Sequence, residues 1–296
     1  MPGDAMLVRS TALLVLLGLV SVSAAAEPVR LTSDGRMKAD PVVTPSGESI
    51  IFTTYEVPTL GRLMRLTLAD KSLERFSPQA ETSEFEATCP ADGSAWAFIQ
   101  SRGNLNLRLV IRDSRTGKDA SFEPGGGFAS LRRPSFTPDG TRIIFSIPAP
   151  NGQEIVSVNR QGQDRKSLTS GGMNTWPAVS PDGKQIAFVT SREGEFDLAI
   201  MNIDGTGYRR LLRRPGMDAR PAWSPDGKRI AFMGAVDGNY NLFLVDADGS
   251  HLTPLVSHPE RDDFPTWHPD GKRVIFVGER NGKSDLYSIT VSELAR

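Results

Sequence analysis

The sequence is poor in the residues from which disulfides, metal sites and thiol chemistry are built. Its 296 residues include one cysteine, Cys89, and three histidines, His251, His258 and His268. A single cysteine excludes an intramolecular disulfide. No two of the histidines stand at a spacing typical of metal ligands. We therefore expect no metal, no cofactor and no catalytic cysteine.

An excess of charge of one sign is also lacking, and so is a long hydrophobic run. The formal net charge is −1, so no basic patch for nucleic acid is expected. The apolar run 11–22 is shorter than the roughly 20 residues of a spanning helix. It follows Arg9 and precedes small residues up to Ala26, which is the pattern of a secretory signal. The sequence predicts a signal peptide at 1–26, export to the periplasm with the extracellular space as the alternative, and no transmembrane anchor.

What the chain does contain is one motif, present six times. Each copy runs from a strand segment through a turn of the Pro-Asp-Gly type into an apolar, β-branched stretch, as in Pro221–Phe232. The turn glycines lie 43 to 47 residues apart, at Gly47, Gly93, Gly140, Gly183, Gly227 and Gly271. A period of about 40 to 45 residues is typical of a propeller blade. The sequence predicts an all-β, six-bladed β-propeller of four-stranded blades, in one domain over 27–296.

The ends of the repeat region predict how the ring closes. The last unit ends at its third strand, Asp285–Ile289, without a fourth. The segment Val29–Ser33 resembles the fourth strand of a middle unit, Lys166–Ser170. We expect this N-terminal strand to complete the last blade, because closure removes exposed sheet edges.

At two positions of the repeat, the residues are predicted to pack in the core. Trp223 and Trp267 share a position that is hydrophobic in other units, and we expect them in the core. Cys89 is aligned with Thr44 and Thr137, and we expect a small, buried side chain there rather than a nucleophile.

One position in each unit is a candidate for binding. The residue just before the innermost strand's core segment should face the mouth of the central tunnel. In chain order these residues are Asp40, Glu86, Arg133, Trp176, Arg220 and Phe264. Arginine and aromatic residues dominate binding hot spots. The six are therefore the predicted partner-binding site; the alternative is that they cap the tunnel and hold its loops.

An enzymatic alternative uses carboxylates around the same mouth. Asp40, Glu86, Asp218 and Asp262 are the candidates for a hydrolase-like or lyase-like propeller acting on glycans or peptides. The Gly-x-Ser-x-Gly motif of α/β-hydrolases is absent from the sequence. We prefer a non-enzymatic protein.

The motif Pro-Ala-Trp-Ser-Pro-Asp-Gly-Lys-Arg-Ile-Ala-Phe, at Pro221–Phe232, resembles the repeat of the TolB-like propeller family, whose namesake belongs to the Tol-Pal envelope system. The resemblance extends from Val29 to the end of the chain and does not include the family's N-terminal α/β domain. It implies a monomeric, periplasmic module that binds a protein or peptide at the tunnel mouth, with an outer-membrane lipoprotein among the candidate partners. The same repeat is similar to modules of peptidase gates and polysaccharide lyases.

Overall fold

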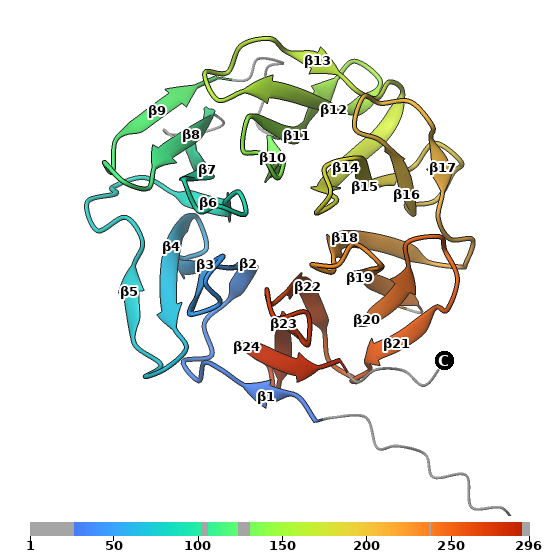
Figure 1. Ribbon diagram of the computed structural model, residues 1–296. Helices are drawn as coiled ribbons and strands as arrows, with labels where there is room; N and C mark the ends of the chain where they lie inside the picture. The colour runs from blue at the N-terminus through green and yellow to red at the C-terminus, as the bar shows by residue number, and fades with distance from the viewer. Residues whose placement is uncertain (1–26, 102–105, 124–130, 237, 292–296) are drawn as a thin grey trace, which may run out of the picture.

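Each repeat folds into short antiparallel strands, and the computed structural model arranges these strands as a ring around a common centre (Figure 1). The structure describes residues 27–101, 106–123, 131–236 and 238–291. This part of the chain contains 24 strands and no helix, so it holds no helix long and apolar enough to span a membrane. The all-β propeller prediction is confirmed. The predicted signal peptide at 1–26 lies outside the described residues.

Four separate sheets have four strands each. They are made of β2 (Lys38–Val43), β3 (Ser49–Val57), β4 (Leu60–Thr67) and β5 (Leu73–Arg75); β6 (Glu84–Thr88), β7 (Ala95–Ser101), β8 (Leu107–Asp113) and β9 (Asp119–Phe122); β18 (Met217–Trp223), β19 (Arg229–Val236), β20 (Asn239–Asp246) and β21 (Thr253–Val256); and β22 (Asp262–Trp267), β23 (Arg273–Arg280), β24 (Lys283–Thr290) and β1 (Val29–Arg30).

The other eight strands form one sheet. They are β10 (Arg132–Phe136), β11 (Arg142–Ala149), β12 (Gly152–Asn159), β13 (Lys166–Ser167), β14 (Gly172–Val179), β15 (Gln185–Thr190), β16 (Asp197–Asn202) and β17 (Arg209–Arg210). Two antiparallel groups, β10–β13 and β14–β17, are joined by a parallel pairing of β12 with β14 at Gly152 and Gln153. The predicted count of six blades therefore stays a prediction.

The turn after each innermost strand explains the repeated sequence. In Ser180–Gly183 the amide of Gly183 donates to the Ser180 carbonyl (2.9 Å), and Gly183 has a φ of 71°. The Asp182 side chain accepts from the Ser180 hydroxyl (2.6 Å) and from the Lys184 amide (3.1 Å). The turn thus needs glycine for the left-handed backbone and aspartate for the local hydrogen bonds.

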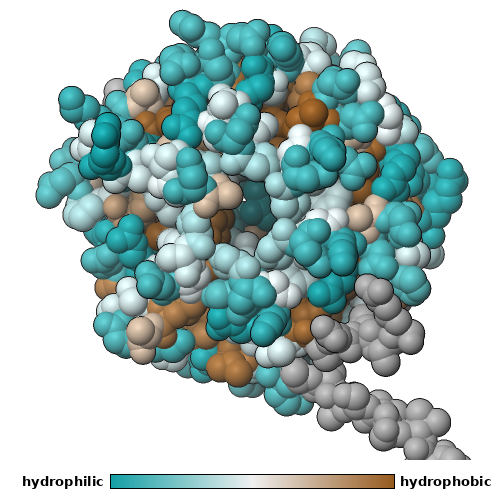
Figure 2. All heavy atoms as spheres, in the orientation of Figure 1, coloured by the Kyte–Doolittle hydropathy of each residue, from teal (hydrophilic) through white to brown (hydrophobic). Residues whose placement is uncertain are grey.

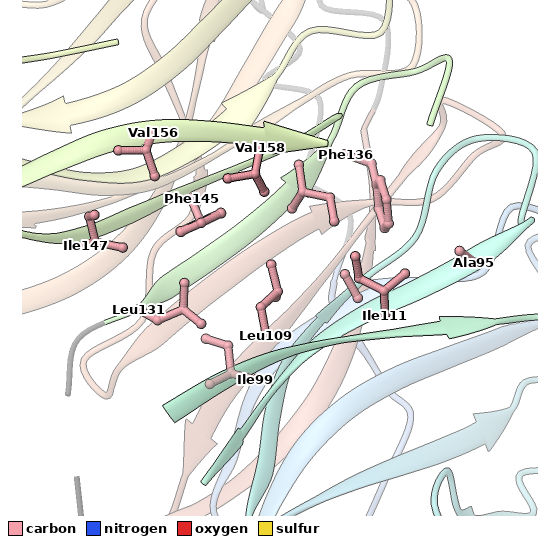
Figure 3. Packing of buried hydrophobic residues seen from close by; sticks show 12 residues of the cluster. Ala95, Ile99, Leu109, Ile111, Leu131, Phe136, Phe145, Ile147, Val156 and Val158 are labelled. Carbon is pink, nitrogen blue, oxygen red and sulfur yellow. The ribbon is translucent and has the colours of Figure 1, made fainter. Parts of the chain in front are cut away.

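The hydrophobic core lies in the seams between neighbouring sheets. Figure 3 shows one seam, where Ile99 and Leu109 of one sheet meet Leu131 and Phe145 of the next. Trp223 and Trp267 lie in two other seams, as predicted, and are 9% and 7% exposed. Each indole crosses to the preceding sheet: Trp223 donates to the Ala178 carbonyl, and Trp267 donates to the Ala222 carbonyl.

The predicted alignment of Cys89 with the threonines is wrong by one position. Thr88 pairs with Ala97 as Val42 pairs with Ile51, and the turn bond accepted by the Thr44 carbonyl is accepted by Pro90 in the second unit. Cys89 therefore occupies the position of Val43, Phe136, Val179, Trp223 and Trp267. The Pro-Ala-Asp-Gly turn caused the error, because its proline lies one residue before the usual place. The thiol is unsuited to nucleophilic chemistry, since burial raises its pKa to about 12.

The ring closes where β1 pairs with β24, so the N-terminal strand completes the last sheet as predicted. This pairing covers only Val29 and Arg30. A buried carboxylate, that of Asp285, reinforces it by accepting hydrogen bonds from Arg30, from the Thr32 hydroxyl (2.8 Å) and from the Lys38 ammonium (3.3 Å). The side chains of Asp285 and Lys38 are both fully buried.

We predict that Asp285→Asn lowers the free energy of unfolding by about 2 to 3 kcal/mol, because Arg30 and Lys38 lose a buried charged acceptor while Lys38 keeps its ion pair with Asp34. Urea unfolding measures the change. The control is Asp164→Asn, whose pair with Arg142 involves a carboxylate side chain that is 57% exposed; its expected cost is about 1 kcal/mol or less. Equal losses in the two variants would contradict the assigned role of Asp285.

Candidate functional site

Each innermost strand has a β-bulge at the residue predicted to face the tunnel mouth. The six residues have φ angles between 49° and 54°, and the ladder register shifts across each of them; they are Asp40, Glu86, Arg133, Trp176, Arg220 and Phe264. A left-handed backbone costs a residue other than glycine roughly 1 to 2 kcal/mol. Bulges redirect side chains, and proline, which follows five of the six residues, fits a position that needs no ladder donor.

The six bulges come from β2, β6, β10, β14, β18 and β22, the strands nearest the centre in Figure 1. Figure 2 shows the molecule hollowed at the centre of the ring. Side chains from strands that are not neighbours meet there: Arg133 of β10 lies 3.4 Å from the carboxylate of Asp40 of β2, although β6 lies between the two strands. The structure therefore brings the predicted residues together, and their role in binding stays a prediction.

One side of the mouth is charged. Glu86 accepts hydrogen bonds from the backbone amide of Arg133 and from the side chain of Arg132 (3.1 Å). Asp40 and Glu86 are both buried, at 7% exposure. Burial, and then the negative charge of Asp40, raise the pKa of Glu86 above its ordinary value. Arg133 therefore contacts both carboxylates: its backbone amide donates to Glu86, and its side chain pairs with Asp40.

The other side of the mouth is aromatic around one arginine. The Arg220 guanidinium carbon lies 4.0 Å from the ring centre of Phe264 and 5.1 Å from that of Trp176. Its Nη1 donates to both oxygens of Asp263, at 3.2 and 3.1 Å, and its Nε is buried without a partner. Burial lowers the pKa of Arg220, and the nearby charge of Arg133 acts in the same direction.

Sequence reasoning missed two groups at the mouth. Asp263 anchors Arg220 and also accepts hydrogen bonds from Arg261 and from the Phe264 amide (2.7 Å). Its position directly before Phe264 is the signal that could have identified it. Tyr55 lies in β3, outside the position examined in the repeats; burial, and then Asp40 and Glu86, raise its pKa.

The carboxylates proposed for catalysis are not all brought together. Asp40 and Glu86 lie at the mouth, but Asp218 pairs with Arg214 (2.5 Å) and Asp262 pairs with Arg280 (2.8 Å). Burial raises the pKa values of both Asp218 and Asp262, that of Asp218 to about 6. Arg214 lies four residues before Asp218, and Arg280 of β23 lies on the strand next to Asp262 of β22, so the structure favours a packing role for both carboxylates.

Metal ligation has no visible basis at the mouth. In the residues that the structure describes, no three histidine, cysteine, aspartate or glutamate side chains are grouped as a metal ion would require. His268 instead contacts the first turn, with its Nε2 3.0 Å from the Gly47 carbonyl oxygen. The described side chains of the mouth offer ion pairing, hydrogen bonding and stacking, and Asp40 and Glu86 add two neighbouring carboxyl groups.

Comparison with known proteins identifies the repeats. The model of the TolB beta propeller domain matches residues 177–295. Residues 177–295 are thus similar to this domain, and the protein is described below as a TolB-like propeller.

Two relatives match parts of this TolB-like propeller. The Tol-Pal system protein TolB of Myxococcus xanthus is 36% identical over 149 residues, which cover 41% of this chain and 34% of the relative. Dipeptidyl-peptidase 5 of Porphyromonas endodontalis is 38% identical over 100 residues, which cover 30% of this chain and 13% of the relative. The matched part is thus about a third or less of each relative's length.

Solved structures share the fold of the TolB-like propeller. A protein described as putative TolB from Agrobacterium tumefaciens aligns with a TM-score of 0.67 and 20% identity, over 88% of this chain and 93% of that one. An oligogalacturonate lyase from Vibrio parahaemolyticus aligns with a TM-score of 0.59 and 13% identity, over 92% of this chain and 95% of that one. At these identities the likeness shows the fold alone.

We predict that Asp218 makes the TolB-like propeller less stable as the pH rises. Its pKa is about 6 in the folded protein and 3.8 ordinarily, so the folded state binds the proton more tightly. The stability from that proton is complete below about pH 4 and is lost through pH 6. Relative to Asp218→Asn, the parent should lose roughly 2 to 3 kcal/mol between pH 4 and pH 7 in urea unfolding. Parallel pH profiles for the two proteins would contradict this.

Proposed function

We propose that this TolB-like propeller is an exported, non-enzymatic module of the cell envelope that binds a protein or peptide at its tunnel mouth. The observation that supports the proposal is the set of six left-handed bulges, one at each predicted binding residue of the inner strands. Backbone strain repeated at six equivalent positions is characteristic of functional sites. The named relatives include a Tol-Pal system protein, which supports an envelope role.

The chemistry of the mouth suits a partner segment that carries an acidic and an apolar side chain. The Arg220 guanidinium lies 5.1 and 4.0 Å from the ring centres of Trp176 and Phe264, and the side chain of Arg133 forms a 3.4 Å ion pair with Asp40. Trp176 and Phe264 are half-buried. Arginine and tryptophan in a largely desolvated pocket are the residues that contribute most at protein interfaces. An outer-membrane lipoprotein is the proposed partner.

We further propose that the mouth is built from six blades. On this reading the eight-stranded sheet is two blades, β10–β13 and β14–β17, which touch through the short pairing of β12 with β14. Each four-stranded unit then contributes one left-handed residue to the mouth. The two halves of the eight-stranded sheet supply Arg133 and Trp176.

The test is affinity capture from detergent-solubilised envelope with the tagged mature protein. We expect the parent to recover an outer-membrane lipoprotein, and Trp176→Ala or Arg133→Ala to weaken its binding about 30-fold, which corresponds to about 2 kcal/mol. The matched control is Lys184→Ala, a side chain that is 80% exposed. Melting curves should show all three variants folded. Capture that is equal for the parent and both mouth variants would disprove the assigned site.

One observation favours a second, catalytic candidate function. Asp40 and Glu86 lie together, and the pKa of Glu86 is raised by burial and by Asp40, so the pair could divide acid and base roles. We predict that, if glycan or peptide turnover occurs at the mouth, Glu86→Gln abolishes it and leaves the melting temperature within a few degrees of the parent. Product release from oligosaccharide and peptide libraries measures this. Turnover that persists in Glu86→Gln would contradict the catalytic assignment.

A further inference from the structure

A cavity of about 460 Å³ lies at the seam between the sheets β2–β5 and β6–β9. It opens beside the turns that follow β2 and β6, near Thr44 and Gly93, and beside the turn that follows β8, near Asp113. The bulge residues Asp40 and Glu86 lie within the inner strands β2 and β6, ahead of the turns that border the cavity, and they are not among its lining residues. This volume is within the range of pockets that bind small ligands.

The cavity coincides with two departures from the repeat. Cys89 stands where other inner strands have a larger side chain, including the two tryptophans that cross their seams. Trp96 stands in β7 at the position that isoleucine or valine takes in the other units. Phe76 packs edge-on against Trp96, with ring centres 5.2 Å apart, and both rings line the cavity. The seam between these two sheets is therefore packed differently from its counterparts.

Two arginines meet over the same ring of this wall. The guanidinium carbons of Arg65 and Arg112 lie 5.7 and 5.4 Å from the centre of the Phe76 ring. Arg112 is fixed by two hydrogen bonds to Asp119 (2.8 and 2.9 Å) and one to Ser77 (2.8 Å). Arg65 makes one hydrogen bond to Glu74 (3.3 Å), and its Nε is buried without a partner. Arg65 is thus held by fewer side-chain hydrogen bonds than Arg112, and its side chain is 40% exposed.

Two carboxylates among the lining residues supply acceptors. Asp92 uses its Oδ1 to accept from the Ser94 amide (2.9 Å), and Asp113 uses its Oδ1 to accept from Thr116 (2.7 Å). These hydrogen bonds hold the pKa of each carboxyl below its ordinary value, so both are ionised. Their Oδ2 atoms lie outside these bonds. Hydroxyl groups of Thr44, Ser46 and Ser114 also line the cavity.

We propose that this seam cavity binds a neutral sugar, as a monosaccharide or one end of a glycan. The two lining carboxylates, Asp92 and Asp113, repel an anionic ligand. The two lining arginines, Arg65 and Arg112, repel a cationic one. A ligand that both donates and accepts at many positions fits the mixed lining, and sugar hydroxyls do both. The Phe76–Trp96 wall provides the apolar surface that the C–H face of a sugar ring contacts. The site is independent of the tunnel mouth and of the function proposed for it.

The test is calorimetric titration of the mature protein with glucose, N-acetylglucosamine, maltose and cellobiose. We expect saturable binding of at least one of them with a Kd of about 1 mM or tighter. Arg65→Met and Asp92→Asn should each weaken that binding about tenfold or more. The matched control is Arg75→Met, an exposed arginine of the same sheet outside the cavity lining, which should bind as the parent does.

Trp176→Ala separates this site from the mouth, because it should lose the envelope partner and keep the sugar. Melting curves confirm that the variants are folded. No saturable binding of any of the four sugars up to roughly 20 mM would overturn the proposal. So would equal effects of Arg65→Met and Arg75→Met, or tighter binding of glucuronate than of glucose.

Discussion

Closure of the ring is the constraint on which the rest of the structure depends. Every sheet buries its two faces against its neighbours, so a core made of seams is complete only when the first and last sheets also meet. The structure secures this with a two-residue pairing of β1 with β24 and with the buried carboxylate of Asp285. Strand pairing this short would be weak alone. The buried ion pair between Asp285 and Lys38 joins β24 to β2, and the seam packing provides most of the stability.

Closure also creates the mouth, because six inner strands can converge on one axis only in a ring. The left-handed bulge is what each strand contributes there. It interrupts the alternation of side chains, so that Arg220 and Trp176 face one another while the rest of each strand packs in its seam. Each bulge holds a residue other than glycine in a left-handed conformation, which costs energy at every repeat.

The repeats differ at the two candidate sites. At the mouth, one repeat position is occupied by two carboxylates, two arginines and two aromatic residues. At the seam beside Phe76, a cysteine and a tryptophan replace the usual residues and accompany a cavity. The framework is thus set by what the repeats share, and the candidate sites are set by how they differ.

The sequence alone determined the propeller, the strand that closes it and the position that faces the mouth, because turns and strand patterns are local and recur with the repeat. It did not reveal which of those residues touch. The contact of Asp40 with Arg133, the stacking on Arg220 and its anchoring by Asp263 join strands far apart in the chain. The register of Cys89 and the ion pair of Asp218 with Arg214 also depended on the bulges and on local packing. Only the tertiary structure decided these, because ring closure brings distant strands to one axis.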